Sequence, residues 1–389
     1  MTERSLTVAV VGCGALARSL HLPNIVANDR LVLHTCCDLS ETALAECQDN
    51  FKPIHTCNDY REVAADPEVD VVVLAATEKL RLPVITACAD AGKPVYVEKP
   101  LAASLDALYA IQRVVQAADL PVCVGHNRRC APAMVEARAL YHRHLADPQS
   151  FPWRYDREGP DHRPALADAG ATAMSVQIND DWYSWKGWVF DKSQVPYGPL
   201  VFEMTHFTDL CNWIIASDPV EVVALGSDML NHGVVIRYAQ GQLATITMGS
   251  NGSMGYPKER YEISGAGATV VIEHMVEIRT AGIPGAPLHK IYPLLGDRHP
   301  QIGSEGGLSG WLAKKQAACA EAVKRGDPLR SFSAEPDKGH ARAIDRFVDE
   351  IRGTGPKVCP VEDAVLATRV AFAAVRSVQT GRAVKLEEI

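Results

Sequence analysis

The chain has 389 residues, of which 47% are hydrophobic and 22% charged, the balance of an ordinary globular protein with room for two domains. The formal net charge of −8 argues against nucleic acid or an anionic membrane surface as a main partner. The longest apolar runs, such as 69–76, are far too short to span a bilayer. The N-terminus reads as a strand and its turn and shows no secretory signal pattern.

Eleven cysteines, an odd number, are spread along the chain without a C-x-x-C pair or a repeated spacing. This usage predicts reduced thiols in a cytoplasmic protein, with neither a disulfide framework nor a metal site. Cys36 and Cys37 are adjacent in a predicted strand, and we interpret them as small core residues.

The first 125 residues alternate short β-rich runs with helical patterns. Strands separated by helices form βαβ units and a parallel sheet, so residues 1–125 are predicted to be a doubly wound, nucleotide-binding Rossmann domain. The expected strands are 6–11, 31–37, 69–75, 94–97 and 121–125.

The turn after the first strand reads "VGCGALA" and places Gly12, Gly14 and Ala17 in the G-x-G-x-x-A spacing. Glycines at these positions allow a tight turn and let backbone N–H groups approach a pyrophosphate closely. A lone glycine pattern is weak, but this one follows a predicted strand and opens a helix. We therefore expect Gly12, Gly14, Ala15 and Leu16 to bind a dinucleotide.

The second strand ends at Asp38, about twenty residues beyond the glycine motif. Its carboxylate would accept hydrogen bonds from the adenosine ribose and repel a 2′-phosphate, and no arginine follows it, which favours NAD over NADP. The alternative is a solvated turn carboxylate. We assign Leu39, Ala76 and Thr77, which also follow strands, to the same cofactor.

The fourth strand runs into Glu98, Lys99 and Pro100. One interpretation is a surface ion pair at a strand end, with the proline stopping the strand. The other is chemical, because a lysine at the carboxyl end of a parallel strand faces the crevice where such folds bind ligands.

From residue 171 onward, runs of alternating polarity follow one another with short turns, which predicts a mostly antiparallel sheet with one packed face. Residues 126–389 would thus form an α+β domain with a large open sheet, suited to self-association as a dimer or tetramer. The terminal helices would return to the first domain or cover the junction. The expected strands are 171–180, 219–228, 232–240, 241–250, 259–267 and 268–279, the expected helices 200–215, 339–353 and 360–381, and the expected long loop 146–170.

The order of several motifs resembles the Gfo/Idh/MocA family of sugar and cyclitol oxidoreductases. The resemblance covers almost the whole chain, and the linked order is more specific than any one motif. It implies an N-terminal Rossmann domain, a C-terminal sheet domain, bound NAD(P), and hydride exchange with a sugar or polyol. The motifs are "VGCGALA", "AATEKLRLPVITACADAGKPVYVEKPLA", "GHNRRCAP", "EMTHFTDL" and "VEDAVLATRVAFAAVRSVQTGRAV".

By this resemblance Lys99 matches the catalytic lysine of an E-K-P motif, and Pro100 a proline that is commonly cis. An alcohol that loses hydride must also lose a proton, and a lysine can accept it if burial and a cationic nicotinamide lower its pKa. Glu98 would orient the lysine or contact the cofactor.

The motif "EMTHFTD" supplies His206, which matches the family's catalytic histidine, and Asp209, a substrate contact. Many members carry an aspartate four residues before the histidine, where this chain has Phe202. Glu203 shares the helix face and is the expected substitute. Either the lysine or the histidine could be the proton acceptor.

Further contacts are expected in two segments. Asn127 and Arg128 match a family segment near cofactor and substrate, although a carboxylate is an equally good partner for the arginine. The stretch 179–191 holds Asp181, Trp182, Trp185 and Trp188, which form either a carbohydrate-stacking wall or a packed loop or interface. Arg81 replaces a histidine common in the family, with no effect that we can assign.

The sequence thus predicts an NAD-dependent dehydrogenase acting on a secondary alcohol of a sugar, glycoside or cyclitol, with the substrate between the nicotinamide, Lys99 and His206. A first alternative is redox-assisted glycoside cleavage, in which NAD is regenerated within the cycle. A second is a catalytically silent NAD-binding regulatory protein.

Overall fold

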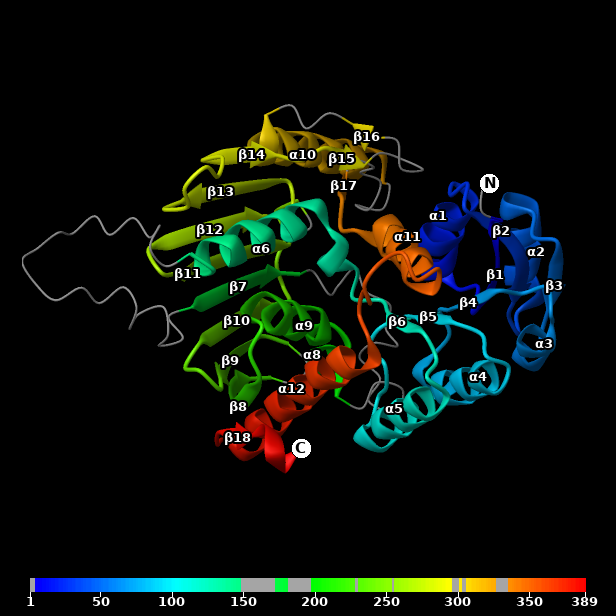
Figure 1. Cartoon of the computed structure of the whole chain (residues 1–389). Coiled ribbons are helices and arrows are strands. Elements are labelled where there is room, and N and C mark those ends of the chain that lie inside the picture. Colours follow the sequence, from blue (N-terminus) through cyan, green and yellow to red (C-terminus); the bar gives the residue numbers. More distant parts are fainter. Residues whose placement is uncertain are drawn as a thin grey trace, which may run out of the picture. The chain divides into compact units, whose positions relative to one another are not determined.

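The computed structural model describes residues 4–147, 172–180, 197–227, 230–253, 255–295, 301–302, 306–326 and 335–389 (Figure 1). The chain divides into two compact units, and each is described by itself. The first comprises residues 1–129 and 339–369, and the second comprises residues 130–338 and 370–389. The prediction was a boundary after residue 125, with the terminal helices returning to the first domain or covering the junction. The first unit includes a second segment, residues 339–369, from near the C-terminus.

The first unit contains a six-stranded sheet in the order β3-β2-β1-β4-β5-β6, and all of its pairings are parallel. This is the Rossmann order, so the predicted fold class is confirmed. The prediction omitted β3, which is three residues long and mostly exposed and therefore has no hydrophobic signal. The strands are β1 (Leu6–Val11), β2 (Leu31–Cys37), β3 (His55–Cys57), β4 (Val71–Leu74), β5 (Val95–Val97) and β6 (Val122–Val124).

Helices connect these strands and bury them on both faces, which is why β4, β5 and β6 are buried at every residue. Side-chain caps start three helices: the hydroxyl of Ser40 accepts from the Ala43 amide at α2, the carboxylate of Asp59 from the Arg61 amide at α3, and the hydroxyl of Ser104 from the Ala107 amide at α5. The helical segments are η1 (Ala17–His21), α1 (Leu22–Val26), α2 (Glu41–Phe51), α3 (Tyr60–Ala65), α4 (Glu78–Asp90), α5 (Leu105–Ala118), η2 (Asn127–Cys130) and α11 (His340–Ile351).

The second unit is built on a nine-stranded sheet, β14-β13-β12-β11-β7-β10-β9-β8-β18. Only β7 and β10 pair in parallel, so the mostly antiparallel sheet that the polarity pattern predicted is confirmed. The strands are β7 (Ala173–Asn179), β8 (Pro219–Gly226), β9 (His232–Tyr238), β10 (Leu243–Gly249), β11 (Glu259–Gly265), β12 (Ala268–Glu273), β13 (Glu277–Ala281), β14 (His289–Ile291) and β18 (Val384–Lys385).

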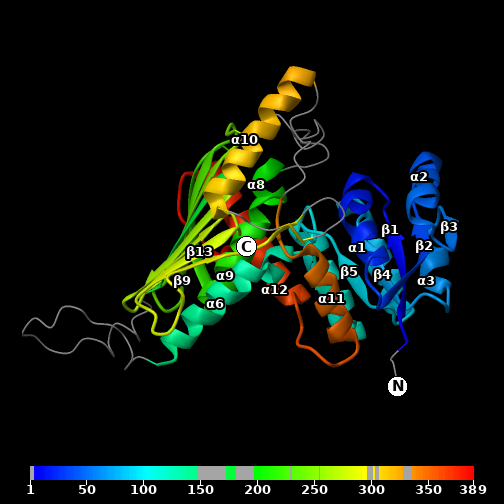
Figure 2. The ribbon, with the colours of Figure 1, turned by 90° about the horizontal axis from the view of Figure 1, so that it is seen from above.

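Helices α6 (Pro132–Leu145) and α9 (Met204–Ile215) lie on the same face of this sheet, against β12 and β7 respectively (Figure 2). A small sheet, β16-β15-β17, adds to the unit. Its strands and the remaining helical segments are β15 (Leu294–Leu295), β16 (Gln301–Ile302), β17 (Glu335–Pro336), α8 (Gly198–Phe202), α10 (Gly307–Arg325) and η6 (Leu386–Glu388).

The last long helix, α12 (Val361–Thr380), contains the residue at which the division between the two units falls. In the described ranges no helix has the length and apolarity needed to cross a membrane.

Two predicted elements of the second unit were wrong in extent. The run 268–279 is two strands, β12 and β13, because His274 and Met275 adopt φ angles of 52° and 60° and reverse the chain between them. The helix expected over 200–215 is interrupted at Glu203, which ends α8 and precedes α9.

Candidate functional site

The candidate cofactor residues of the first unit follow five different strands, β1, β2, β4, β5 and β6. These strands are parallel and adjacent, so their carboxyl ends share one edge of the sheet, where open α/β folds bind ligands.

The two glycines of the motif serve different purposes. Gly12 has φ +91°, and a Cβ atom on it would lie 2.5 Å from the backbone N of Ala76, so the packing of β1 against the turn after β4 requires glycine. Around Gly14 a Cβ would meet nothing within 4 Å. Gly14, Ala15 and Leu16 are exposed, which leaves their backbone accessible to a phosphate group.

Asp38 holds this loop in place. Its Oδ2 accepts a hydrogen bond of 2.7 Å from the Cys13 amide, and its Oδ1 accepts one of 2.8 Å from the Ser40 amide. Each carboxylate oxygen keeps a second lone pair for another donor. Asp38 thus links the glycine loop to the turn that follows β2 through these two hydrogen bonds. The sequence alone does not reveal this structural role. Leu39 beside it is 81% exposed.

Glu98 is 6% exposed, which excludes the surface ion pair considered for this strand end. Its Oε1 lies 2.8 Å from Nε2 of His21, and its Oε2 accepts a 3.2 Å hydrogen bond from the Lys99 amide. Burial raises the pKa of Glu98, but the hydrogen bond from His21 and the charges of His21, Lys99 and His340 outweigh it and set this pKa at about 2. His21 was not among the predicted residues.

Lys99 is half-buried, and its peptide bond to Pro100 is cis, as the resemblance implied. Its backbone is held from two sides, because Nη2 of Arg81 donates to the Lys99 carbonyl at 3.3 Å and Glu98 accepts from its amide. The backbone on which the lysine side chain stands is therefore fixed by two buried charged residues.

Arg81, a residue to which the sequence assigned no role, is 3% exposed. Its Nη2 lies 3.5 Å from Oε1 of Glu78 one helical turn away. Among the described residues, its Nε and Nη1 have no hydrogen-bond partner. Burial lowers the pKa of Arg81, and the charges of Glu78 and Glu98 act in the opposite direction.

Asn127 and Arg128 follow β6 in the short helix η2, and both are buried. The neighbouring Arg129 lies 2.6 Å from Asp363, which ties this turn to the first residues of α12. Thr77, the remaining predicted cofactor residue, precedes α4 and is exposed, and its hydroxyl makes no capping hydrogen bond there.

In the second unit, Glu203 belongs to a buried ionic cluster. Nζ of Lys258 lies 2.8 Å from Oε1 of Glu203 and 2.7 Å from Oδ2 of Asp180, and both carboxylates are 5% exposed. Asp180 follows β7 and Lys258 directly precedes β11, so the cluster joins two adjacent strands to the start of α9. The sequence pointed to Glu203 but not to either partner.

His206 and Asp209 lie on α9, where they are 7% and 0% exposed. The amide of His206 donates to the Glu203 carbonyl at 3.1 Å. The aromatic segment with Asp181, Trp182, Trp185 and Trp188 lies outside the described residues.

Two family models match the chain. Residues 6–126 match the Gfo/Idh/MocA oxidoreductase family's NAD-binding Rossmann fold, and residues 174–386 match its C-terminal α/β domain. The two matches follow the two halves of the chain in the expected order.

Relatives and solved structures span almost the full chain. A myo-inositol 2-dehydrogenase of Thermotoga maritima is 22% identical over 385 residues, which cover 99% of each protein. A 1,5-anhydro-D-fructose reductase of Ensifer adhaerens is 23% identical over 388 residues, 97% of this chain and 98% of that one. The scyllo-inositol dehydrogenase of Lactobacillus casei, solved with NAD(H) and scyllo-inositol, superposes with a TM-score of 0.67 at 16% identity, covering 99% of this chain and 100% of that one.

The residues of the first unit fit the dinucleotide that the family's Rossmann domain binds. Gly14 leaves open space where a side chain would block a phosphate, and Asp38 offers acceptors for ribose hydroxyls.

Proposed function

The chain belongs to the Gfo/Idh/MocA oxidoreductase family, and from this premise we propose that it is an NAD-dependent dehydrogenase of a secondary alcohol in a sugar, glycoside or cyclitol. The observation that carries the proposal is the setting of Lys99. Its backbone is clamped by Glu98 and Arg81 at the edge of the sheet where the dinucleotide residues gather.

In this reaction Lys99 accepts the hydroxyl proton of the substrate. Bound NAD would supply the hydride acceptor at its nicotinamide ring. The amine of Lys99 must be neutral to take the proton. Glu98 positions this lysine through its amide, and its own carboxylate stays anionic because its pKa is about 2.

We propose NAD rather than NADP because of Asp38. Its carboxylate is fixed by the amides of Cys13 and Ser40, so it cannot turn away from a 2′-phosphate without breaking both bonds. A fixed negative charge at that point repels the phosphate and accepts from an unmodified ribose.

His206 is the second candidate for the proton acceptor, and Glu203 its proposed helper in place of the family's usual aspartate. Nζ of Lys258 pairs with Oε1 of Glu203, the residue that directly precedes the His206 helix. We propose Arg128 and Asp209 as substrate contacts, since a guanidinium and a carboxylate together complement the hydroxyls of a polyol.

The substrate class rests on chemistry shared by the relatives, whose names specify inositols and an anhydro sugar. Redox-assisted glycoside cleavage begins with the same oxidation and is the second candidate function. The binding-protein alternative is disfavoured, because a silent protein has no need for a lysine clamped at the cofactor edge.

The test is a panel of inositols, sugars and glycosides incubated with the purified protein and NAD, following reduced nicotinamide by absorbance. Net reduction with at least one cyclic polyol supports the dehydrogenase. Product formation without net reduction supports the cleavage route, and binding without any turnover contradicts both.

We also propose that the protein self-associates through the outer face of its large sheet. Hydrophobic residues on β8, β9 and β10 alternate with buried ones and therefore point away from the helices. The exposed members are Val223, Leu225, Val235 and Leu243. Sedimentation of the full chain checks this proposal, with a dimer or larger species as the expected result and a monomer as the contrary one.

A further inference from the structure

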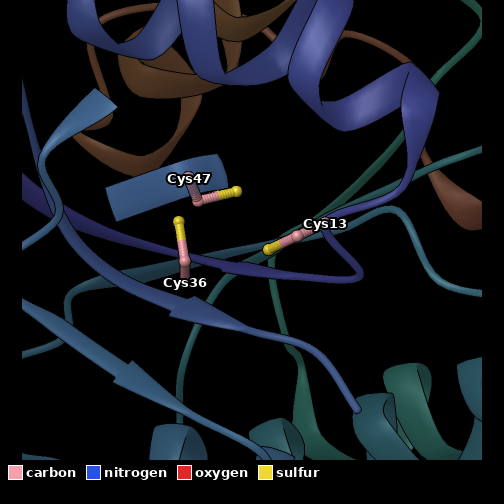
Figure 3. Close-up of side chains that lie close together, drawn as sticks. All are labelled: Cys13, Cys36 and Cys47. Atoms are coloured by element: carbon pink, nitrogen blue, oxygen red, sulfur yellow. The ribbon is translucent and has the colours of Figure 1, made fainter. Parts of the chain in front are cut away.

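Three thiols that are far apart in the sequence meet inside the first unit. Cys13 lies between the two motif glycines, Cys36 in β2 and Cys47 in α2, and their side chains converge in Figure 3. All three are 0% exposed, and their sulfur atoms all lie within 4.8 Å of one another. The spacing of the cysteines predicted no metal site, because ligands from three different elements share no local spacing.

The arrangement has the size of a three-sulfur metal site. Sulfur ligands stand about 2.3 Å from a bound ion, so three of them around one ion are separated by about 4 Å. The three sulfurs therefore need to move only slightly to share an ion. Thiolates select soft cations, above all Cu(I), over the hard ions that prefer oxygen.

The protonation of Cys13 and Cys47 disfavours their oxidation. A hydrogen bond with Cys36 and burial raise the pKa of the Cys13 thiol, and burial raises the pKa of Cys47 to about 12. Protonated, buried thiols are poor nucleophiles and react slowly with oxidants. A soft cation binds sulfur strongly enough to displace the protons. The charge of Arg18, paired with Glu46 beside Cys47, partly offsets the negative charge that results.

The position of Cys13 couples this site to the cofactor. Its amide donates to Asp38, and its two neighbours are the motif glycines. Gly12 lies close to the backbone of Ala76, because a Cβ atom placed on it would stand 2.5 Å from the Ala76 N. Drawing the Cys13 sulfur toward β2 and α2 would strain this amide contact.

We propose that Cys13, Cys36 and Cys47 form a binding site for a soft monovalent cation of the Cu(I) type, and that a bound ion weakens dinucleotide binding. The ion bonds to the three sulfurs and displaces their protons to solvent, with no electron transferred. The site is independent of which alcohol the protein oxidises.

The test is a titration of the full chain with Cu(I) held by the coloured chelator bathocuproine disulfonate. The chain is expected to withdraw one equivalent of copper, and X-ray absorption to show sulfur neighbours only. Cys36→Ala and Cys47→Ala should each lose this uptake. Cys88→Ala is the matched control, since Cys88 is buried in the same unit and burial raises its pKa to about 12 as well. Circular dichroism verifies that each variant is folded.

The coupling is measured as NAD affinity with and without one equivalent of Cu(I). Copper should weaken NAD binding by about fivefold or more in the natural chain, and leave it unchanged in Cys47→Ala. Failure to withdraw copper, or uptake that Cys36→Ala and Cys47→Ala both retain, overturns the site. Equal NAD affinity with and without bound copper overturns the coupling. Neither result bears on the dehydrogenase proposal, because no alcohol is present.

Discussion

Glu98 in the first unit and His274 in the second are buried to a similar degree, at 6% and 3% exposure, yet at neutral pH one is charged and the other is neutral. Glu98 has a hydrogen bond from His21, and its pKa of about 2 keeps it charged at neutral pH. The ring centroids of His274 and Trp311 are 4.5 Å apart. Neither ring nitrogen of His274 has a hydrogen-bond partner in the part of the chain that the structure describes. Burial, with the charge of Lys338, lowers its pKa to about 3 and keeps it neutral.

The contrast teaches that a buried group keeps its charge in this protein where a partner offsets the loss of water. Two buried carboxylates with such partners lie next to the candidate catalytic residues. Glu98 directly precedes Lys99 in the first unit, and Glu203 directly precedes the helix of His206 in the second. His274, whose ring nitrogens have no hydrogen-bond partner among the described residues, has the opposite outcome and is neutral.

Removing a cation that two buried carboxylates share should lower the stability of the second unit most. Lys258→Met leaves the buried carboxylates of Glu203 and Asp180 without their common cation, so we expect the free energy of unfolding to fall by about 3–5 kcal/mol. Lys290→Met is the control, because Lys290 pairs with Glu136 at the surface, where such a pair contributes about 0–1 kcal/mol. Urea unfolding of both variants measures the difference, and equal losses would contradict the account.

Acid should destabilise the second unit through His274. Its folded pKa of about 3 lies below the unfolded value of about 6.5, so the folded protein binds fewer protons, and stability falls as the pH drops from about 6.5 to about 3. The slope is about 1.4 kcal/mol per pH unit within this window. His274→Phe removes the titrating group and should flatten that part of the stability curve. An unchanged slope in the variant shows that His274 is charged or solvated in the folded protein.

Glu98 should affect the stability of the protein at a lower pH than His274 does. Its folded pKa of about 2 lies below the unfolded value of about 4.3, so its contribution is present at neutral pH and lost as the pH falls from about 4.3 to about 2. The full shift corresponds to about 3 kcal/mol. Glu98→Gln should therefore lose less stability than the natural chain between pH 5 and pH 2, measured by thermal unfolding. If the stability of both proteins falls equally over this range, Glu98 is not held in its charged form by its partners.

The smallest expected effect concerns cofactor choice. Asp38→Asn removes the charge and, because an amide nitrogen cannot accept, one of the two backbone hydrogen bonds. The ratio of NADP to NAD affinity should rise by about tenfold, equivalent to about 1.4 kcal/mol. Fluorescence titration of both cofactors measures it, with Asp59→Asn, a helix-capping aspartate of the same unit, as the control. If the natural chain binds both cofactors equally, the Asp38 argument is wrong.

Local patterns predicted much of this fold. The bounds of β1 and β2 and the positions of Gly12 and Gly14 follow from hydrophobic runs and a short motif, and all agree with the structure. The turn at His274 was missed because left-handed residues without glycine carry no sequence signal.

The partners within the site could not be predicted, because they lie far apart along the chain. His21 is 77 residues from Glu98, and Lys258 is 55 residues from Glu203. Cys13, Cys36 and Cys47 likewise come together only when β1, β2 and α2 assemble. A single sequence shows which residues carry chemistry, but folding decides which of them meet.

The proposed role of Lys99 as the proton acceptor of the substrate alcohol is tested by separating cofactor binding from turnover. NAD binding and turnover are compared in Lys99→Met, Lys79→Met and the natural chain, using the first polyol of the panel that reduces NAD. Lys79 is an exposed lysine on α4 of the same unit. Lys99→Met is expected to keep its NAD affinity while kcat falls by about 10²–10⁴-fold, and Lys79→Met to retain full turnover. An unchanged kcat in Lys99→Met would contradict this role and leave His206 as the proton acceptor.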